Sequence, residues 1–270
     1  MADLLQLILS GTATGAIYAL CALGFTLLWQ ASGTINFAQG EFVMIPAFVM
    51  LFFINTAGLP LWVAFLLTCL VAMLLIATLG LSIGVKQLVK AGVTAQAMPF
   101  ESPFPDGLLA LGAMKVSYAD VGTLLLAGLI VVGLQLFLNR TVTGRAMQAV
   151  AQNTDAAKVL GINVQRMVLY TFLINAVLAV VAALLVTPTY LAKFDMGESI
   201  GLKAFYAAII GGFNQTRGAL LGGVLVGVLE NLMGAYVSPA YKEGVALMLF
   251  LIVIIFRPEG LLGKTEERKV

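Results

Sequence analysis

Long apolar runs without any charge restrict this chain to very few folds. Residues 4–28, 61–79, 121–138 and 167–186 contain no Asp, Glu, Lys or Arg. A helix of ~20 such residues spans the hydrocarbon core of a bilayer and bonds all of its own backbone groups. Over the whole chain 61% of residues are hydrophobic and 10% are charged, whereas a soluble domain carries roughly a quarter charged residues. We therefore expect an all-α, polytopic transmembrane helical bundle that forms a single domain over residues 1–270.

Shorter apolar stretches complete the set of expected spans. Residues 42–54, 200–212, 219–236 and 245–256 bring the expected number to roughly eight. Residues 200–212 would be only about 20 Å long as a helix at ~1.5 Å per residue, so this span is predicted to be tilted or broken. The acidic, Pro-rich residues 92–120 predict an external loop.

Residues 61–89 leave the side of the N-terminus open. This stretch is too long for one ordinary transmembrane helix and contains no turn that would separate two. One span would put the N-terminus inside the cell, and two spans would put it outside. The absence of Lys and Arg before Lys86 favours the external N-terminus.

One polar segment, residues 140–166, interrupts the apolar runs. It carries four of the fifteen basic residues, so it cannot cross a bilayer, and the positive-inside rule places it in the cytoplasm. Residues 144–160 are predicted to form one short helix with a face of small residues, which suits the docking of a soluble partner such as an ATPase. We therefore predict a cytoplasmic coupling segment over residues 141–166. The residues expected to take part in ATPase coupling are Gly144, Arg145, Ala149, Asn153, Ala156, Ala157 and Gly161.

Polar side chains within or beside the spans are candidates for a translocation path. Asn36, Gln39 and Glu41 lie among glycines, which is typical of an unwound segment that lines a cavity or of a turn between helices. Glu230 lies within an apolar span and should face protein or water, either bonding a neighbouring helix, which we favour, or lining the path. Tyr18 lies in the first span, from which its side chain could reach a pore.

Two glycine pairs predict close contacts between helices. Gly11 and Gly15 form one GxxxG pair, and Gly223 and Gly227 form another. Small residues at this spacing allow membrane helices to approach each other closely. Packing is the simpler role for both pairs.

The residues needed for an active site are missing from the sequence. There is no His, which makes a zinc site or a His-based proton relay improbable, and no GxxxxGK[ST] loop for phosphates. No nucleophile lies beside an evident base, and no basic and aromatic cluster suits nucleic acid. Cys21 and Cys69 both lie in apolar spans and are interpreted as packing residues. We expect a non-catalytic membrane subunit that binds no metal or cofactor itself.

Four motifs identify a resemblance that covers nearly the whole chain. They are GTATGAIYALCALGFTL at 11–27, NFAQGE at 36–41, TGRAMQAVAQNTDAAKVLGIN at 143–163, and KAFYAAIIGGFNQTRGALLGG at 203–223, the last continuing through Glu230 to FRPEGLLG at 256–263. With these motifs the chain resembles the permease subunit of the high-affinity branched-chain amino acid ABC importer, of the hydrophobic amino acid uptake type.

That resemblance implies a heteromeric transporter in the bacterial inner membrane, with the C-terminus of this chain in the cytoplasm. Its expected partners are two ATP-binding subunits, a second related permease and a periplasmic substrate-binding protein. ATP and Mg would bind to the partner subunits, and residues 144–160 would act as the coupling helix. Two alternatives stay open: a urea or short-amide permease of the same type, and a self-sufficient secondary transporter. The latter would need Glu41 and Glu230 as ion-coupling groups, and neither has an obvious partner in the sequence.

The chain departs from the resemblance near residue 80. Similar permeases carry a basic cytoplasmic loop between the third and fourth spans, whereas here ATLGLSIGVKQLV follows CLVAMLL directly. We hypothesise that the natural protein carries an additional basic loop at this point. An intact mass of 28.5 kDa would contradict the hypothesis.

Overall fold

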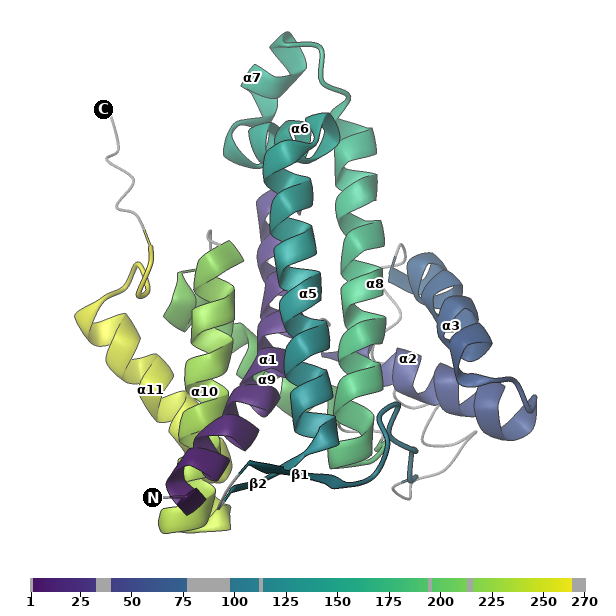
Figure 1. The fold of residues 1–270 in the computed structure, drawn as a ribbon. Helices are drawn as coiled ribbons and strands as arrows, with labels where there is room; N and C mark the ends of the chain where they lie inside the picture. Colours follow the sequence, from purple (N-terminus) through teal and green to yellow (C-terminus); the bar gives the residue numbers. More distant parts are fainter. Residues whose placement is uncertain are drawn as a thin grey trace.

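The computed structural model describes residues 2–32, 40–76, 98–111, 114–193, 196–212 and 216–263. Within these ranges the chain is a bundle of helices with one short β-hairpin (Figure 1). The elements are α1 (Ala2–Ser32), α2 (Glu41–Leu51), the π-helix η2 (Phe52–Thr56), α3 (Leu61–Ile76), β1 (Leu108–Leu111), β2 (Met114–Ser117), α5 (Tyr118–Arg140), α6 (Val142–Gln152), α7 (Thr154–Val159), α8 (Val164–Tyr190), α9 (Met196–Gly211), α10 (Thr216–Tyr236), the 3-10 helix η3 (Pro239–Tyr241) and α11 (Lys242–Phe256).

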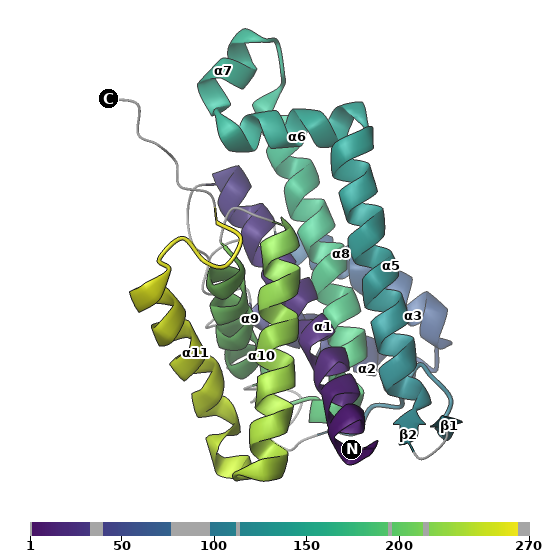
Figure 2. The same cartoon turned by 60° about the vertical axis from the view of Figure 1, so that its left-hand side comes forward.

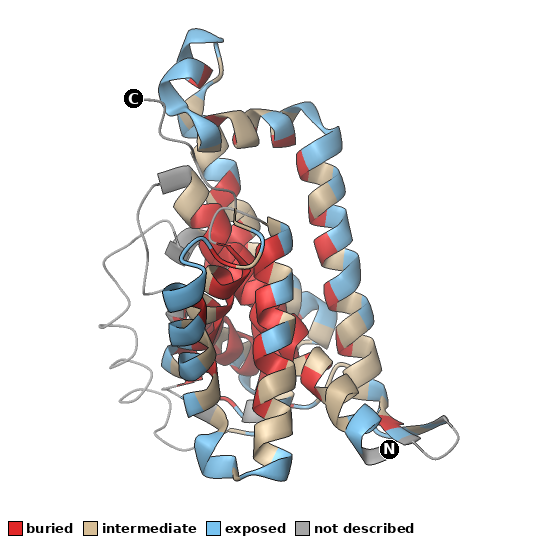
Figure 3. Ribbon diagram, turned by 90° about the vertical axis from the view of Figure 1, so that its left-hand side faces the viewer, coloured by how far each residue is buried: buried red, intermediate tan, exposed pale blue. Residues whose placement is uncertain are grey.

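Helix α1 is the centre of the bundle. It packs against α5, α8, α9 and α10, and its residues from Gly15 to Leu28 are all buried. A helix that is apolar on every side has to be surrounded by protein or lipid, and here the surrounding helices bury it. Figure 3 shows the buried residues concentrated in the middle of the bundle, with exposed residues along its outer faces and on its projecting end.

Helices α1 and α10 touch through glycines. A Cβ atom built on Gly15 would lie 2.7 Å from the carbonyl oxygen of Gly223 and 2.7 Å from Cα of Val224. On the other helix, a Cβ on Gly227 would lie 2.6 Å from the carbonyl oxygen of Gly11. The two backbones are therefore in direct contact, which confirms the packing role predicted for both GxxxG pairs.

The expectation of a transmembrane helical bundle is confirmed. Four described helices are long and apolar enough to cross a bilayer: Leu4–Gln30, Tyr118–Arg140, Val164–Thr189 and Thr216–Tyr236. Shorter apolar helices are Phe42–Thr56, Leu61–Met73 and Gly244–Phe256. Helix α9 is one continuous helix of 16 residues that begins at Met196, so the break predicted as one possibility for residues 200–212 is not found within it. The questionable stretch near residue 80 lies outside the described residues.

The two ends of the bundle differ in structure. Helices α6 and α7 project from one end, and the N-terminus and the β-hairpin lie at the other (Figures 1 and 2). The antiparallel hairpin pairs Leu108 with Ser117 and Leu111 with Met114. Part of the predicted 92–120 loop is therefore regular structure, which the sequence analysis missed. The start of α5, at Tyr118, follows the hairpin directly.

Candidate functional site

Three polar side chains meet in the interior of the bundle, and we call them the triad: Tyr18, Lys203 and Glu230. The Lys203 ammonium nitrogen lies 2.7 Å from Oε1 of Glu230, and the Tyr18 hydroxyl donates a hydrogen bond of 2.8 Å to Oε2 of the same carboxylate. Lys203 also donates to the Tyr18 hydroxyl oxygen at 3.4 Å, and its Nζ lies 5.5 Å from the centroid of the Tyr18 ring. Both oxygens of the buried carboxylate are thus satisfied.

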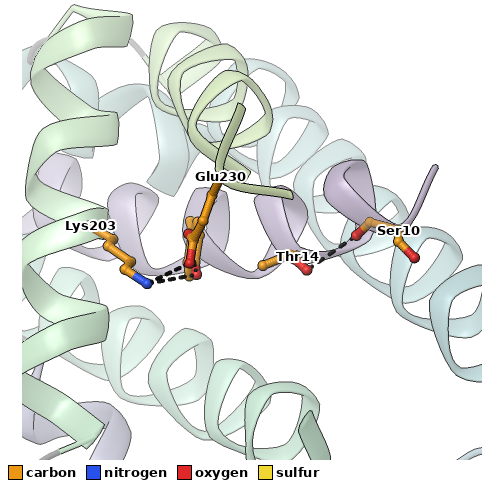
Figure 4. Close-up of polar contacts among 5 residues, drawn as sticks. Ser10, Thr14, Lys203 and Glu230 are labelled. Carbon is orange, nitrogen blue, oxygen red and sulfur yellow. Dashed lines mark hydrogen bonds and ion pairs between the residues drawn. The ribbon is translucent and has the colours of Figure 1, made fainter. Parts of the chain in front are cut away.

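The triad joins three helices that are far apart in sequence. Tyr18 comes from α1, Lys203 from α9 and Glu230 from α10. The exposed fractions are 0% for Tyr18, 5% for Lys203 and 2% for Glu230, so protein covers nearly all of the surface of the ion pair. The close-up in Figure 4 shows Lys203 and Glu230 reaching toward each other across the space between their helices. Charges at membrane depth are costly unless they are paired in this way.

Glycines and alanines around the triad allow its helices to converge. On α9 and α10, Ala207 and Gly222 are in backbone contact, as are Gly211 and Gly218. On the other side of α9, a Cβ on Gly201 would lie 2.7 Å from Cα of Gly40, immediately before α2. Small residues thus set the distances between helices that bring a lysine, a glutamate and a tyrosine into bonding range.

Lys203 also borders an open cleft between α9 and α11. The cleft has a volume of about 500 Å³ and is lined by Glu198, Ser199, Leu202, Tyr206, Gly244 and Leu247 in addition to Lys203. The ring of Tyr206 stacks against Phe250 of α11, with centroids 4.8 Å apart. One partner of the buried ion pair is therefore adjacent to a space that a small molecule or a neighbouring helix can fill.

The structure brings together two of the five predicted translocation-path residues, Tyr18 and Glu230. The prediction that Glu230 bonds a neighbouring helix is confirmed, and the interpretation that it has no evident partner is wrong, because Lys203 pairs with it. Sequence reasoning missed Lys203, although a lone lysine in an apolar helix is itself a signal that an acid lies nearby. Asn36 and Gln39 lie outside the described residues. Glu41 begins α2, but its side chain is also outside the described part.

At the opposite end from the hairpin, the predicted coupling segment is two helices and not one. Asn153 interrupts it with an extended backbone, at φ −156° and ψ 104°, and its side chain accepts a hydrogen bond of 2.9 Å from the backbone N–H of Ala156. Asn153 therefore caps α7, and the single helix predicted over 144–160 is wrong at this position. Asparagine favours such N-cap positions over helix interiors because its side chain competes for backbone donors.

The other predicted coupling residues have separate places in these two helices. Gly144 is buried against the end of α5, where a Cβ would lie 2.6 Å from Cα of Leu138. Ala157 is also buried, Arg145 and Ala156 are exposed, and Ala149 is half-buried. Gly161 follows α7 with φ +78°, a left-handed conformation that glycine adopts at low cost.

An apolar tip projects from the end of α7. Val159 is 88% exposed and Leu160 is 76% exposed, and Figure 2 shows that α7 is the most distant part of the fold from the N-terminus. The face of α6 that points back into the protein carries the buried residues Met147 and Val150. Two exposed apolar side chains on a projecting helix form a suitable contact for another protein.

The described residues contain no group of three or more Cys, Asp or Glu side chains that could hold a metal ion. Cys21 and Cys69 are both free and buried, as their apolar surroundings predicted. The molecule thus combines a polar triad buried among apolar helices with a polar segment that projects from one end.

The matching family and two similar proteins are branched-chain amino acid transport permeases. Residues 7–89 and 73–254 match the family described as "Branched-chain amino acid transport system / permease component". The chain is 32% identical over 300 aligned positions to the high-affinity branched-chain amino acid transport system permease protein BraD of Pseudomonas aeruginosa, covering 98% of each chain. It is 31% identical to the corresponding permease protein LivH of Escherichia coli, over 98% of this chain and 97% of that protein.

One more distant relative and one solved structure are also similar to this chain. A probable branched-chain amino acid transport permease of Methanocaldococcus jannaschii is 27% identical over 92% of this chain and 89% of that protein. Among solved structures, PsaBC from Streptococcus pneumoniae in complex with Fab has a similar fold, with a TM-score of 0.51 at 16% identity, over 96% of this chain and 91% of that one. The two segments matched by the family overlap at residues 73–89, where the sequence also departs from the expected pattern.

Proposed function

The chain belongs to the branched-chain amino acid transport permease family, and from this we propose that it is the membrane-spanning subunit of an ABC importer for branched-chain amino acids. The observation that carries the proposal is the likeness to BraD and LivH, which extends over 98% of the chain and includes both the triad helices and the projecting segment. The chain supplies the path through the inner membrane and no catalytic group.

The energy for transport comes from separate subunits in this proposal. Two ATPase subunits bind ATP and Mg and hydrolyse ATP, a second related permease completes the pore, and a periplasmic protein delivers the substrate. The C-terminus and the projecting segment lie in the cytoplasm, where the ATPases are. Alternating access then requires that motion of the ATPases reaches the membrane helices.

The projecting segment is the proposed point of that coupling. Thr141 is the single residue between α5 and α6. Its hydroxyl oxygen accepts a hydrogen bond of 2.9 Å from the backbone N–H of Gly144 and so caps the start of α6. Gly144 is in backbone contact with α5, and α7 leads into α8 through Gly161. Movement of the apolar tip of α7 would therefore be transmitted to both α5 and α8.

The test is to purify the chain together with its ATPase subunits and to change the tip. We expect Leu160→Asp, alone or with Val159→Asp, to reduce the amount of ATPase subunit that co-purifies by about tenfold, since a charge in an apolar protein contact costs one to several kcal/mol. Leu108→Asp is the matched control, because Leu108 is 58% exposed on the hairpin at the opposite end, and it should leave co-purification unchanged.

Two results would contradict the proposal at different levels. If the ATPase subunits never associate with the unchanged chain, the ABC importer assignment fails. If they associate equally well with the unchanged chain and the tip variants, the assignment stands and the coupling role of residues 141–166 fails.

A further inference from the structure

A polar cavity lies at the end of the bundle opposite to α6 and α7. This outer cavity has a volume of about 290 Å³, which is at the lower end of the range for small-molecule sites, so it accommodates one small molecule. Ser10 and Thr14 of α1 line it on one side, and Asp120, Asn231 and Lys242 line it from α5, α10 and α11. Ser102, Thr123 and Thr189 also line it, so eight polar side chains converge on one space.

Among the residues that line the outer cavity, Asp120 and Lys242 are the charged ones. The Asp120 carboxylate accepts a hydrogen bond of 3.0 Å from the Ser10 hydroxyl at its Oδ2 atom, which holds it in place. The methylene groups of Lys242 lie against Gly234 of α10, where a Cβ would be 2.9 Å from Cε. Within the described residues, the Lys242 ammonium forms no ion pair. The cavity thus presents one negative and one positive group from different helices.

Apolar side chains also line the outer cavity. Ala13 and Ile17 of α1 and Leu185 of α8 are buried and line the outer cavity, together with Phe104. A carboxylate, an ammonium and an aliphatic surface in a small space complement the three parts of a free aliphatic amino acid, namely its ammonium group, its carboxylate and its side chain. Charge-assisted hydrogen bonds of this kind are about twice as strong as neutral ones.

The outer cavity and the triad share two helices. Ser10, Thr14 and Tyr18 follow one another at intervals of four residues, so they share one face of α1. In the view of Figure 4, Thr14 lies between Ser10 and Glu230, and Lys203 lies on the far side of Glu230. Asn231 in the cavity wall directly follows Glu230. The outer cavity therefore shares α1 and α10 with the triad, and residues next to Tyr18 and Glu230 in sequence line it.

We infer that the outer cavity binds one free aliphatic amino acid as its zwitterion, with Asp120 accepting hydrogen bonds from the ammonium group and Lys242 donating them to the carboxylate. This inference rests on the proposed function and adds to it a substrate site in the permease chain itself. The headgroup of a zwitterionic phospholipid carries the same pair of charges, and the test separates the two sources.

The test measures binding of radiolabelled L-leucine to the purified permease–ATPase complex without its binding protein, in discs of phosphatidylglycerol. We expect Asp120→Asn and Lys242→Gln each to weaken binding by about tenfold or more, which is typical of losing one charged hydrogen bond. Asp120→Glu and Lys242→Arg keep the charges and should retain most of the affinity. Competition by two analogues assigns the two groups. N-acetyl-leucine lacks the ammonium, so it should compete less well than leucine for the unchanged chain and about as well as leucine only for Asp120→Asn. Leucinamide lacks the carboxylate, so it should compete less well than leucine for the unchanged chain and about as well as leucine only for Lys242→Gln.

Matched controls come from the same end of the protein. Asp106 and Lys115 are exposed there and do not line the outer cavity, so Asp106→Asn and Lys115→Gln should bind leucine as the unchanged chain does. Undetectable binding at millimolar leucine, or equal binding by the Asp120 and Lys242 variants, overturns the inference. Loss of leucine binding when phosphatidylethanolamine is added to the discs also overturns it, because the site would then belong to lipid.

A parallel assay keeps the inference separate from the proposed function. ATP-driven uptake of L-leucine by the unchanged complex with its binding protein, in proteoliposomes, tests the importer assignment alone. If uptake occurs and Asp120→Asn and Lys242→Gln import leucine at the unchanged rate at all concentrations, only the outer-cavity site is wrong. If no branched-chain amino acid is taken up, the proposed function itself fails.

Discussion

At the scale of single residues, the ion pair between Lys203 and Glu230 dominates the interior of the bundle. We expect Lys203→Met to destabilise the protein by about 3–5 kcal/mol, because it leaves a carboxylate buried without a counter-charge. The double variant Lys203→Met/Glu230→Gln removes both charges, and the amide at position 230 still bonds the Tyr18 hydroxyl. We therefore expect it to regain most of the stability that the single variant loses. Thermal unfolding of the purified protein in detergent measures both effects.

Lys193→Met serves as the control for this pair of variants. Lys193 is exposed after α8, and removing its charge should change stability by less than about 0.5 kcal/mol. A single variant at Lys203 that is as stable as the unchanged protein would contradict the pairing. If the double variant is stable but no longer transports, the triad also takes part in transport, beyond its role in holding α1, α9 and α10 together.

Two residues of the triad could be predicted from the sequence, and the third was missed. Tyr18 and Glu230 could be selected because a polar side chain in an apolar span needs a partner. Which partner it finds depends on how α9 and α10 are rotated about their axes, and two nearly uniformly apolar helices give little periodicity from which to read that rotation. Lys203, 27 residues before Glu230, was therefore missed even though both residues lie in the same quoted motif region.

At the scale of elements, the contact between α1 and α10 determines the shape of the bundle. Alanine in place of Gly227 would improve helix propensity by about 1 kcal/mol, but its Cβ would press on the backbone of Gly15 and Gly11. Overpacking of this kind costs about 1–3 kcal/mol or more when backbone has to move. We therefore expect Gly227→Ala to lower the unfolding temperature of the purified protein.

Gly128 in α5 is the matched control for this substitution. A Cβ at Gly128 would have no atom within 4 Å, so Gly128→Ala should be neutral or slightly stabilising through helix propensity. The two Gly→Ala variants are thus expected to shift stability in opposite directions. Equal shifts in the unfolding temperature would contradict the close contact of α1 and α10.

The elements themselves were largely predictable, since long charge-free runs have one structural solution in a bilayer. Hydrogen bonds from side chains to the backbone, which can interrupt a helix, were harder to predict. Asn153 lies in a stretch with good helical spacing, yet its side chain caps α7 and ends α6. The hairpin at residues 108–117 is short and lies within a Pro-rich segment, where no run of alternating residues is long enough to predict a strand.

At the scale of the whole molecule, charge is distributed unequally between the two ends. Arg140 ends α5, Arg166 lies in the first turn of α8, Arg217 lies in the first turn of α10 and Arg257 follows α11. Figure 1 shows the end of α5 and the start of α8 beside α6, and the start of α10 and the end of α11 are the ends of those two helices that are nearer to α6 and α7. Glu101 and Asp106 belong to the segment around the hairpin at the other end. By the positive-inside rule, this distribution supports the proposal that the arginine-rich end lies in the cytoplasm.

This polarity predicts that single cysteines at the two ends react from opposite sides of the membrane. Cys21 and Cys69 are both buried, so the unchanged chain should react little with a membrane-impermeant thiol reagent and provides the background. Lys115→Cys, on the exposed hairpin, should be labelled in intact spheroplasts, whereas Gln152→Cys, at the exposed end of α6, should be labelled only in inside-out vesicles. Labelling of both from the same side would contradict the arrangement of the two ends. Labelling of each from the side opposite to that expected would keep the fold but reverse its orientation, and the projecting helices could then not meet a cytoplasmic ATPase.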